Sequence, residues 1–559
     1  MFSGHKMTVG PFVLIQTILL LLLRFATFGA DNPNVAQPTV TAITQVTSDG
    51  VSKTNLLSDG ADDLYVTEWP AARHIVARVS LTSGNRRIIQ NRFPNVQALD
   101  ISPDRSSLLV SPMQTGGDNE FWILPVNAGG PRRIGELMGR DAVWSADGHY
   151  LLLSKGTKLY IANADGSGAH EIFTAEGSVF APRVSPDGKH VRFTVGNAAQ
   201  GLTSIWEVGI DGSNPHLAFG NWAGGTTACC GVWPTAVTTL WALLESGPIG
   251  SPIQLTRGPM SFGNASLARD NSKIWAIGVK PAGEVVKYDF SKKSFGSLLA
   301  SVSATDLDYS SDGKWITYIA LPDATLWRCR ADGSERLQLT SAPERAALPH
   351  WSKDGHQIAY VSMWPGMQSK ISLISPRGGT SIDMLQENRG QIDANWSSDG
   401  NRMLFGYLHD TPHLDIRLVD LKTQHVEVVP GSKDLFSPRW SPNERYIVAL
   451  STDFTKVMLF DFQTHKWKTW LTEPAGAVSY PQWSADSKYL FFDDLVTDEE
   501  SIRRVRVGEN RAKRVFKLEG IERYPGPFGL WSGRMPDGSW LFVRDRSTQE
   551  VYQLSVDLP

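Results

Sequence analysis

The stretch WSKDG at residues 351–355 decides the fold, because it returns with small changes along almost the whole chain. Most successive copies lie about 40 to 45 residues apart, and the interval between Asp187 and Asp270 is about twice as long, which indicates one lost copy. A fixed period in the low forties indicates a stacked repeat architecture. Aligned on the Asp or its substitute, the copies are centred on Asp59, Asp104, Asp147, Asp187, Asp270, Asp312, Asp354, Asp399, Asn443, Asp486 and Asp537.

Each repeat has the pattern of four strands joined by turns. Alternating apolar runs follow the motif, such as HQIAYVS at 356–362 and KVMLFDF at 456–462, and this alternation predicts strands. Asp followed by Gly suits tight turns, since Gly accepts positive φ and the Asp side chain caps nearby amides. The Trp before the motif is expected to pack between neighbouring sheets rather than to bind a ligand. These residues are Trp144, Trp351, Trp396, Trp440 and Trp483.

The S-x-D-G repeats resemble the WD40-like propeller repeats of the TolB family and of the tricorn-type propellers. The resemblance covers nearly all of the chain after residue 40. It implies an all-β propeller fold. It does not specify a function, because propellers serve as binding modules, lyases, hydrolase gates and scaffolds alike.

The number of repeats predicts two rings. Twelve units exceed the four to eight blades of a usual propeller. The entering segment 43–50 resembles a fourth strand and the final segment 551–557 a third strand, so each ring is expected to close on its own strands and leave no exposed edge. We therefore predict a first six-bladed propeller at 43–292 and a second at 293–559. A division into seven and five blades is the alternative.

The N-terminus predicts export. Residues 12–23 (FVLIQTILLLLL) form an apolar stretch that suits a signal peptide better than a membrane span, which needs about 20 residues. Residues 1–30 are predicted to be a signal peptide or membrane anchor, and 31–42 a linker. A cleaved signal is favoured over an anchor retained through residues 9–30, and a buried segment is the third reading. The first two predict a periplasmic or extracellular protein.

Composition and cysteines narrow the function classes. A net charge of −3 and a pI near 6.5 give no basic surface for nucleic acid, so that partner class is set aside. Cys229 and Cys230 are expected to be buried thiols, with a strained vicinal disulfide as the alternative. The third cysteine, Cys329, stands apart, and no spacing of Cys and His residues suggests a zinc site. The fifth repeat lacks its turn after Trp233, which predicts an incomplete blade of low local stability.

No motif in the sequence indicates catalysis. We find no G-x-S-x-G elbow, phosphate loop or cofactor motif, so no cofactor is expected. The nearest approach to a metal site is HDTPHLD, with His409, Asp410, His413 and Asp415. Two His and two Asp can hold a divalent cation, but an exposed polar loop is the favoured interpretation.

Binding is therefore the predicted function. In a propeller the loops between the fourth strand of one blade and the first of the next gather near the central channel. We predict an exported, non-enzymatic, TolB-like scaffold or sensor that binds a protein or peptide partner in the cell envelope. A hydrolase or lyase with a channel active site is the alternative. The candidate ligand-binding residues on the channel-face loops are Glu344, Arg345, His350, Glu387, Arg389, Lys433, Asp434 and Tyr480.

Overall fold

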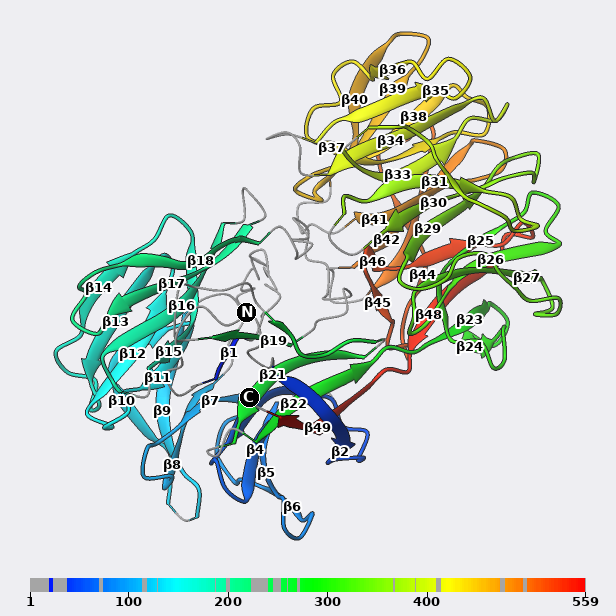
Figure 1. Ribbon diagram of the computed structural model, residues 1–559. Helices are drawn as coiled ribbons and strands as arrows, with labels where there is room; N and C mark the ends of the chain where they lie inside the picture. The colour runs from blue at the N-terminus through cyan, green and yellow to red at the C-terminus, as the bar shows by residue number, and fades with distance from the viewer. Residues whose placement is uncertain are drawn as a thin grey trace, which may run out of the picture. The chain divides into compact units, whose positions relative to one another are not determined.

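The computed structural model contains only strands and their connections in the part that it describes, which confirms the predicted all-β fold (Figure 1). Among these residues no helix is long and apolar enough to cross a membrane. Trp233, Cys229, Cys230, His409 and His413 lie outside the described residues. The structure describes residues 20–23, 38–69, 74–112, 118–127, 129–185, 187–197, 202–222, 240–244, 253–258, 260–268, 272–364, 367–387, 389–408, 414–472, 478–495 and 500–557.

The chain divides into two compact units, each described by itself. Within the described residues, unit 2 comprises 281–547, and unit 1 comprises 20–280 and 548–557. This division differs from the predicted boundary at 292 and 293. The physical reason is that unit 1 closes with the C-terminal strand, so that unit 2 is inserted in the chain before the last strand of unit 1.

Five sheets of unit 2 each use four strands in sequence order. The Ser and Asp of the repeat occupy the turn between the first two strands of a sheet. The sheets are β25–β28 (Ala304–Tyr309, Trp315–Ala320, Thr325–Arg330, Leu337–Gln338), β29–β32 (Arg345–Trp351, Ile358–Met363, Lys370–Ile374, Ile382–Asp383), β33–β36 (Gly390–Trp396, Arg402–Leu408, Ile416–Asp420, Val426–Val428), β37–β40 (Leu435–Trp440, Tyr446–Ser451, Lys456–Asp461, Lys466–Thr472) and β41–β44 (Val478–Trp483, Tyr489–Asp494, Ser501–Arg506, Lys513–Lys517).

The sixth sheet of unit 2 joins the two ends of the unit. It pairs β47 (Ser532–Arg534) and β48 (Trp540–Asp545) with β23 (Gly283–Asp289) and β24 (Ser294–Ser297). Buried apolar clusters lie between successive sheets all the way round. One cluster packs Val286 of the sixth sheet against Ile502, and another packs Val285 against Ile316. The apolar packing of unit 2 therefore returns to the sheet at which it begins.

Unit 1 begins with four sheets of the same kind. Each again uses four consecutive strands in order, with clusters of buried apolar side chains between neighbouring sheets. They are β3–β6 (Lys53–Ser58, Asp63–Glu68, Ile75–Ser80, Arg86–Ile88), β7–β10 (Val96–Ile101, Ser107–Pro112, Asn119–Pro125, Arg132–Gly139), β11–β14 (Asp141–Trp144, Tyr150–Lys155, Lys158–Asn163, His170–Thr174) and β15–β18 (Ser178–Val184, His190–Asn197, Leu202–Gly209, His216–Trp222).

The closing sheet of unit 1 brings the chain ends together. Its order is β2 (Thr39–Gln45), β49 (Thr548–Asp557), β22 (Lys273–Lys280) and β21 (Ser261–Leu267). The entering strand is thus the fourth of its sheet and the final strand the third, as the sequence predicts. The first two strands lie within the predicted first ring, but the third is the C-terminal strand β49 and not a strand of residues 43–292.

The remaining sheet of unit 1 is short in the described residues. Strands β19 (Trp241–Leu244) and β20 (Ile253–Gln254) pair antiparallel, and β1 (Leu20–Leu23) pairs in parallel with β19. Residues 20–23 belong to the predicted leader, so the structure gives part of that segment a place beside the irregular fifth repeat.

The repeated motif forms a hydrogen-bonded turn. Ser352 Oγ donates to Asp354 Oδ1 (2.6 Å), and that carboxylate accepts from the amide of His356 (2.9 Å). Ser352 Oγ also accepts from the amide of Gln357 (2.9 Å). Equivalent hydrogen bonds, led by the one from Ser310 Oγ, lower the pKa of Asp312 to about 2. The motif is therefore a structural turn, and this explains its recurrence.

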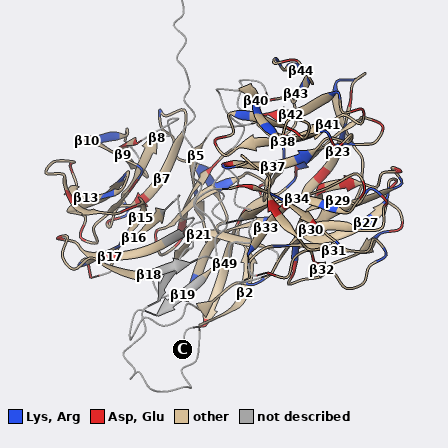
Figure 2. Ribbon diagram, turned by 90° about the horizontal axis from the view of Figure 1, so that it is seen from above, with Lys and Arg blue, Asp and Glu red and all other residues tan. Residues whose placement is uncertain are grey.

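The charges of both units are mixed. Figure 2 shows Lys and Arg among Asp and Glu on the strands and loops of each unit. Many of them form cross-strand ion pairs, such as Arg192 with Glu207 (2.5 Å) and Arg445 with Asp461 (3.3 Å). This pattern agrees with the near-neutral composition.

Candidate functional site

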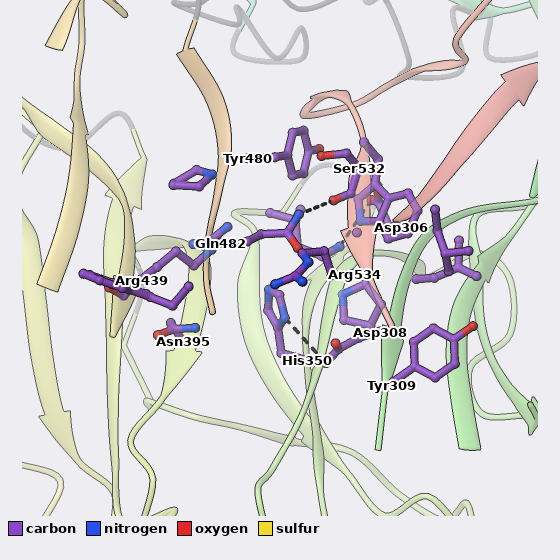
Figure 3. A pocket seen from close by; sticks show the side chains of 18 of the residues that line it. Asp306, Asp308, Tyr309, His350, Asn395, Arg439, Tyr480, Gln482, Ser532 and Arg534 are labelled. Atoms are coloured by element: carbon purple, nitrogen blue, oxygen red, sulfur yellow. Dashed lines mark hydrogen bonds and ion pairs between the residues drawn. The ribbon is translucent and has the colours of Figure 1, made fainter. Parts of the chain in front are cut away.

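A cavity of about 220 Å³ lies in unit 2, among the first strands of its sheets (Figure 3). Its lining comes from β25, β29, β33, β37, β41, β47 and β48 and from the residues next to them. The polar side chains that line it include Asp306, Asp308, Tyr309, His350, Asn395, Arg439, Tyr480, Gln482, Ser532 and Arg534.

A bulge in each of five first strands shapes this lining. The strand register shifts at the same place in β25, β29, β33, β37 and β41. One residue there has positive φ, between 45° and 60°: these are Asp306, Leu348, Asp393, Ser437 and Tyr480. A bulge bends a strand and re-aims the side chains beside it. The residue two positions after each bulge precedes the repeat Trp or Tyr, and all five of these residues line the cavity.

Three of those five side chains form hydrogen bonds with the backbone of a neighbouring sheet. Asp308 Oδ2 accepts from the amide of Trp351 (2.7 Å), and Asn395 Oδ1 accepts from the amide of Trp440 (2.7 Å). Gln482 Nε2 donates to the carbonyl of Ser532 (2.8 Å). These hydrogen bonds fix the side chains in the cavity wall, so the lining is preorganised.

The two cavity arginines have different partners. Arg439 Nη1 donates to the Asp393 carboxylate at 2.8 Å, and both side chains are almost buried. The Arg534 guanidinium instead lies over the ring of Phe491, 4.3 Å from its centroid. Its Nε is buried without a hydrogen-bond partner, and burial lowers the pKa of Arg534. Among the described residues no carboxylate is in contact with Arg534, and the charge of Asp537 only partly opposes the effect of burial on its pKa.

Three further polar atoms of the lining, His350 Nε2, Trp440 Nε1 and Tyr309 Oη, have no hydrogen-bond partner among the described residues. His350 Nδ1 is 3.7 Å from Asp308 Oδ2, whereas its Nε2 is buried and makes no hydrogen bond. The same holds for Trp440 Nε1. Burying a polar atom without a partner costs free energy, and such atoms are uncommon in folded proteins. Their concentration at one cavity indicates a place for a hydrogen-bonding ligand.

Asp306 is the most perturbed carboxyl of the lining. It is 1% exposed, and burial raises its pKa to about 6, against hydrogen bonds from the Leu348 amide and the Thr305 hydroxyl at 3.4 Å each. A carboxyl that exchanges its proton near neutral pH can act in binding or in acid–base chemistry.

A hairpin lies against several first strands of unit 2. It is formed by β45 (Pro525–Gly526) and β46 (Gly529–Leu530), between the last strand of one sheet and β47. Tyr480 donates its hydroxyl hydrogen to the carbonyl of Phe528 (3.2 Å), and the Phe528 ring packs with Leu348 and Ile392. The hairpin therefore contacts three different sheets.

A buried ion pair supports the hairpin. Arg523 Nη2 donates to Asp493 Oδ2 (2.7 Å), and Ser532 Oγ donates to the other oxygen of that carboxylate (2.7 Å). Both side chains of the ion pair are at most 2% exposed. The lining residue Ser532 is therefore held by a carboxylate that is already paired with an arginine.

Of the residues predicted from sequence, His350 and Tyr480 line the cavity. Glu344 is buried and accepts from Tyr360 (2.9 Å) and Ser362 (2.7 Å). Glu387 accepts from the Tyr407 hydroxyl at 2.7 Å. Both glutamates lie in loops before a first strand, bonded to a tyrosine on the second strand of the sheet that follows, and neither lines the cavity.

The other predicted residues also lie outside the lining. The Arg389 guanidinium stacks over the Tyr407 ring, 3.8 Å from its centroid. Burial lowers the pKa of Arg345. Lys433 and Asp434 are exposed, and Asp434 receives a backbone bond to its carbonyl from Thr452 (3.1 Å).

Sequence reasoning missed Arg439, Arg534, Asp306, Asn395 and Gln482. The predicted residues belong to the loops that precede the first strands, whereas these residues lie on or beside the first strands themselves. A signal was present: the residue before the repeat Trp or Tyr is polar in every copy of unit 2 that keeps the serine, yet its chemistry changes from copy to copy. This column reads Asp308, His350, Asn395, Arg439 and Gln482.

The described residues contain no group of three or more His, Cys, Asp or Glu side chains placed to hold a metal. His409 and His413, the weak metal candidates, lie outside the described residues. Cys329 is buried, and burial raises the pKa of its thiol to about 11.

No family model matches the chain. An uncharacterized protein of Agrobacterium fabrum is 28% identical over 117 residues, which are 19% of this chain and 39% of that protein. The uncharacterized peptidase YuxL of Bacillus subtilis is 25% identical over 115 residues, 19% of this chain and 18% of that protein. The chain thus spans less than two fifths of the length of either relative.

Three solved structures are similar to parts of the chain, each at a TM-score below 0.4. A putative TolB from Agrobacterium tumefaciens matches 47% of this chain and 98% of its own, with 17% identity and a TM-score of 0.39. TolB from Acinetobacter baumannii matches 56% and 81%, with 14% identity and a TM-score of 0.33. The tricorn protease matches 82% and 49%, with 14% identity and a TM-score of 0.26. The predicted resemblance to TolB-like propellers is confirmed, and it is a resemblance of fold alone.

Proposed function

We propose that the chain is a non-enzymatic double propeller that binds a peptide segment of a protein partner in the channel of unit 2. In this proposal each unit is a six-bladed ring, and the second ring is inserted in the closing sheet of the first. The continuous apolar packing round unit 2 and the pairing of β2 with β49 support it.

The observation that carries the binding proposal is the cavity with unpaired polar atoms. His350, Trp440 and Arg534 line one volume of about 220 Å³, and His350 Nε2, Trp440 Nε1 and Arg534 Nε are buried with no hydrogen-bond partner in the described part of the chain. A volume of this size admits one side chain or a chain end rather than a folded domain. A protein partner would therefore be recognised through a short protruding segment.

A matched pair of variants tests this proposal. In His350→Trp a larger ring fills part of the cavity, and in His356→Trp the same change falls on an exposed turn. The immobilised proteins are incubated with an envelope extract, and the bound proteins are identified by mass spectrometry. A partner retained by the native protein and by His356→Trp, but lost with His350→Trp, is expected. The same capture by all three proteins would contradict a channel site.

Export belongs to the same proposal. A partner in the envelope requires that residues 1–30 direct the chain across the membrane, either as a cleaved signal or as a retained anchor. Mass measurement of the N-terminus of the protein recovered from its source distinguishes the two outcomes. Recovery in the cytoplasmic fraction with an intact N-terminus would oppose export.

The buried carboxyl of Asp306 supports one alternative function, that of a hydrolase or lyase with its active site in the same channel. A buried carboxyl with a pKa of about 6 can serve as a general acid near neutral pH. Ser532 argues against a serine nucleophile, because it donates to Asp493 and that carboxylate is paired with Arg523. A broad hydrolase and lyase screen decides between the two functions. Turnover that disappears in Asp306→Asn would support the enzyme.

A further inference from the structure

The unit 2 cavity has a local excess of hydrogen-bond donors beside Arg534. Within the described part of the chain the Arg534 guanidinium has one weak hydrogen bond, from Nη2 to the carbonyl of Gly538 at 3.5 Å, and no carboxylate in contact. Trp440 Nε1 can only donate, and His350 Nε2 is free to do so. In Figure 3 the side chains of Arg534 and His350 point into the same part of the cavity.

Arg534 is partly buried, and an anion in contact with such a cation removes much of the free-energy cost of desolvating it. Arg439 differs, because Asp393 already neutralises it at 2.8 Å. The cavity therefore has one unsatisfied guanidinium, and the planar fork of an arginine matches the two oxygens of a carboxylate.

From this arrangement we infer that the cavity binds a single carboxylate group, held by Arg534 with hydrogen bonds from Trp440 and His350. The inference rests on the proposed binding function and specifies the chemistry of its ligand. Asp306 and Asp308 line the same cavity. They would repel a doubly charged phosphate more strongly than a singly charged carboxylate, so the carboxylate is favoured.

Two sources can supply this group: a small free acid, or the C-terminus of a peptide chain. Both present the same planar anion, and the probes below separate them. N-acetylglycine imitates a chain terminus, N-acetylglycinamide is its uncharged analogue, propionate represents a free acid, and inorganic phosphate represents the competing anion.

The test is a ligand-observed NMR titration of the full-length protein with these four probes. Saturable binding of N-acetylglycine, with a Kd on the order of millimolar, and no binding of the amide are expected. Arg534→Gln should weaken binding at least tenfold, since a charge-assisted hydrogen-bond pair is lost. Arg377→Gln, which changes an exposed arginine of the same unit, should leave the affinity unchanged.

Trp440→Phe provides a second test if Arg534→Gln folds poorly. It keeps an aromatic ring and removes only the donor, so a loss of about threefold to tenfold is expected. Tighter binding of N-acetylglycine than of propionate assigns the site to a chain terminus, and equal binding assigns it to carboxylates in general. Equal binding of the amide, tighter binding of phosphate, no binding of any probe, or unchanged affinity in both variants would overturn the inference.

The failures of the two proposals are distinguishable. If the envelope partner is lost with His350→Trp but retained with full affinity by Arg534→Gln, the channel binds a partner without a carboxylate contact. If the native protein captures no partner, the proposed function fails.

Discussion

The replacement Glu550→Gln tests whether unit 1 is closed by the C-terminal strand. The Glu550 side chain is 4% exposed. It accepts from the hydroxyl of Thr47 (2.5 Å), the amide of Gly50 (2.8 Å) and the ammonium of Lys53 (3.0 Å). Lys53 has no exposed side-chain surface, and it keeps Asp49 as a second partner at 2.6 Å after the change. This contact ties the first residues of unit 1 to its last strand.

Breaking a buried ion pair costs about 3 to 5 kcal/mol. The remaining Asp49 partner is partly exposed, so the lower end, about 3 kcal/mol, is expected. For a unit of this size each kcal/mol lowers the Tm by about 2 to 4 °C, which predicts a fall of about 6 to 12 °C in the unfolding transition of unit 1.

Differential scanning calorimetry measures this shift, and limited proteolysis with mass spectrometry assigns the transition to unit 1. Glu284→Gln is the matched control, because Glu284 joins β23 to β48 across the closure of unit 2 through Arg544 (2.9 Å) and the more exposed Arg546 (2.9 Å). The replacement Glu284→Gln should lower the free energy of unfolding by less than about 1 kcal/mol. A Glu550→Gln protein with an unshifted transition would refute the closure by Glu550.

Two further predictions concern unit 2. Asp306→Asn should stabilise the protein above pH 6 by up to about 3 kcal/mol, because burial raises the folded pKa from 3.8 to about 6. Protonated Asp306 contributes its full stability below pH 3.8, and this contribution is lost as the pH rises through 6. The stabilisation by Asp306→Asn should therefore vanish at pH 4. Equal stabilisation at pH 4 and above pH 6, measured by urea unfolding, would contradict this. Ser352→Ala removes a buried hydroxyl with two bonds and should cost about 1 to 2 kcal/mol, whereas Ser334→Ala on an exposed turn should cost less than about 0.5 kcal/mol.

The repeat made most of the fold predictable, because its chemistry is local. Ser352 and Asp354 hold their own turn, and Trp351 and Trp440 are 8% and 7% exposed in the cores between sheets, as expected. The position that each chain end takes within a sheet was also predictable, since β2 and β49 have the sequence patterns of a fourth and a third strand.

The domain boundary was not predictable from the repeat. Copies of one repeat are nearly equivalent as partners, so local pattern cannot determine which pair of strands β49 joins. That choice depends on contacts distant in sequence, such as that of Thr47 with Glu550, and on the pairing of Ile274 with Leu554.

The candidate site was predicted only in part for a related reason. The loops before the first strands carry Glu344 and Glu387, and their charges suggested ligand contacts. In the structure these carboxylates accept hydrogen bonds from Tyr360 and Tyr407 within their sheets. The cavity depends instead on bulges, such as that at Leu348, and a bulge leaves no clear mark in an alternating apolar pattern.

The central claim is that residues 281–547 form a complete ring of their own that carries the ligand site. Thermal unfolding of this fragment alone, with and without N-acetylglycine, tests it most directly. One cooperative transition is expected, with a midpoint that rises with the concentration of N-acetylglycine and not with that of N-acetylglycinamide. A fragment without a cooperative transition, or a midpoint that does not respond to N-acetylglycine, would contradict it.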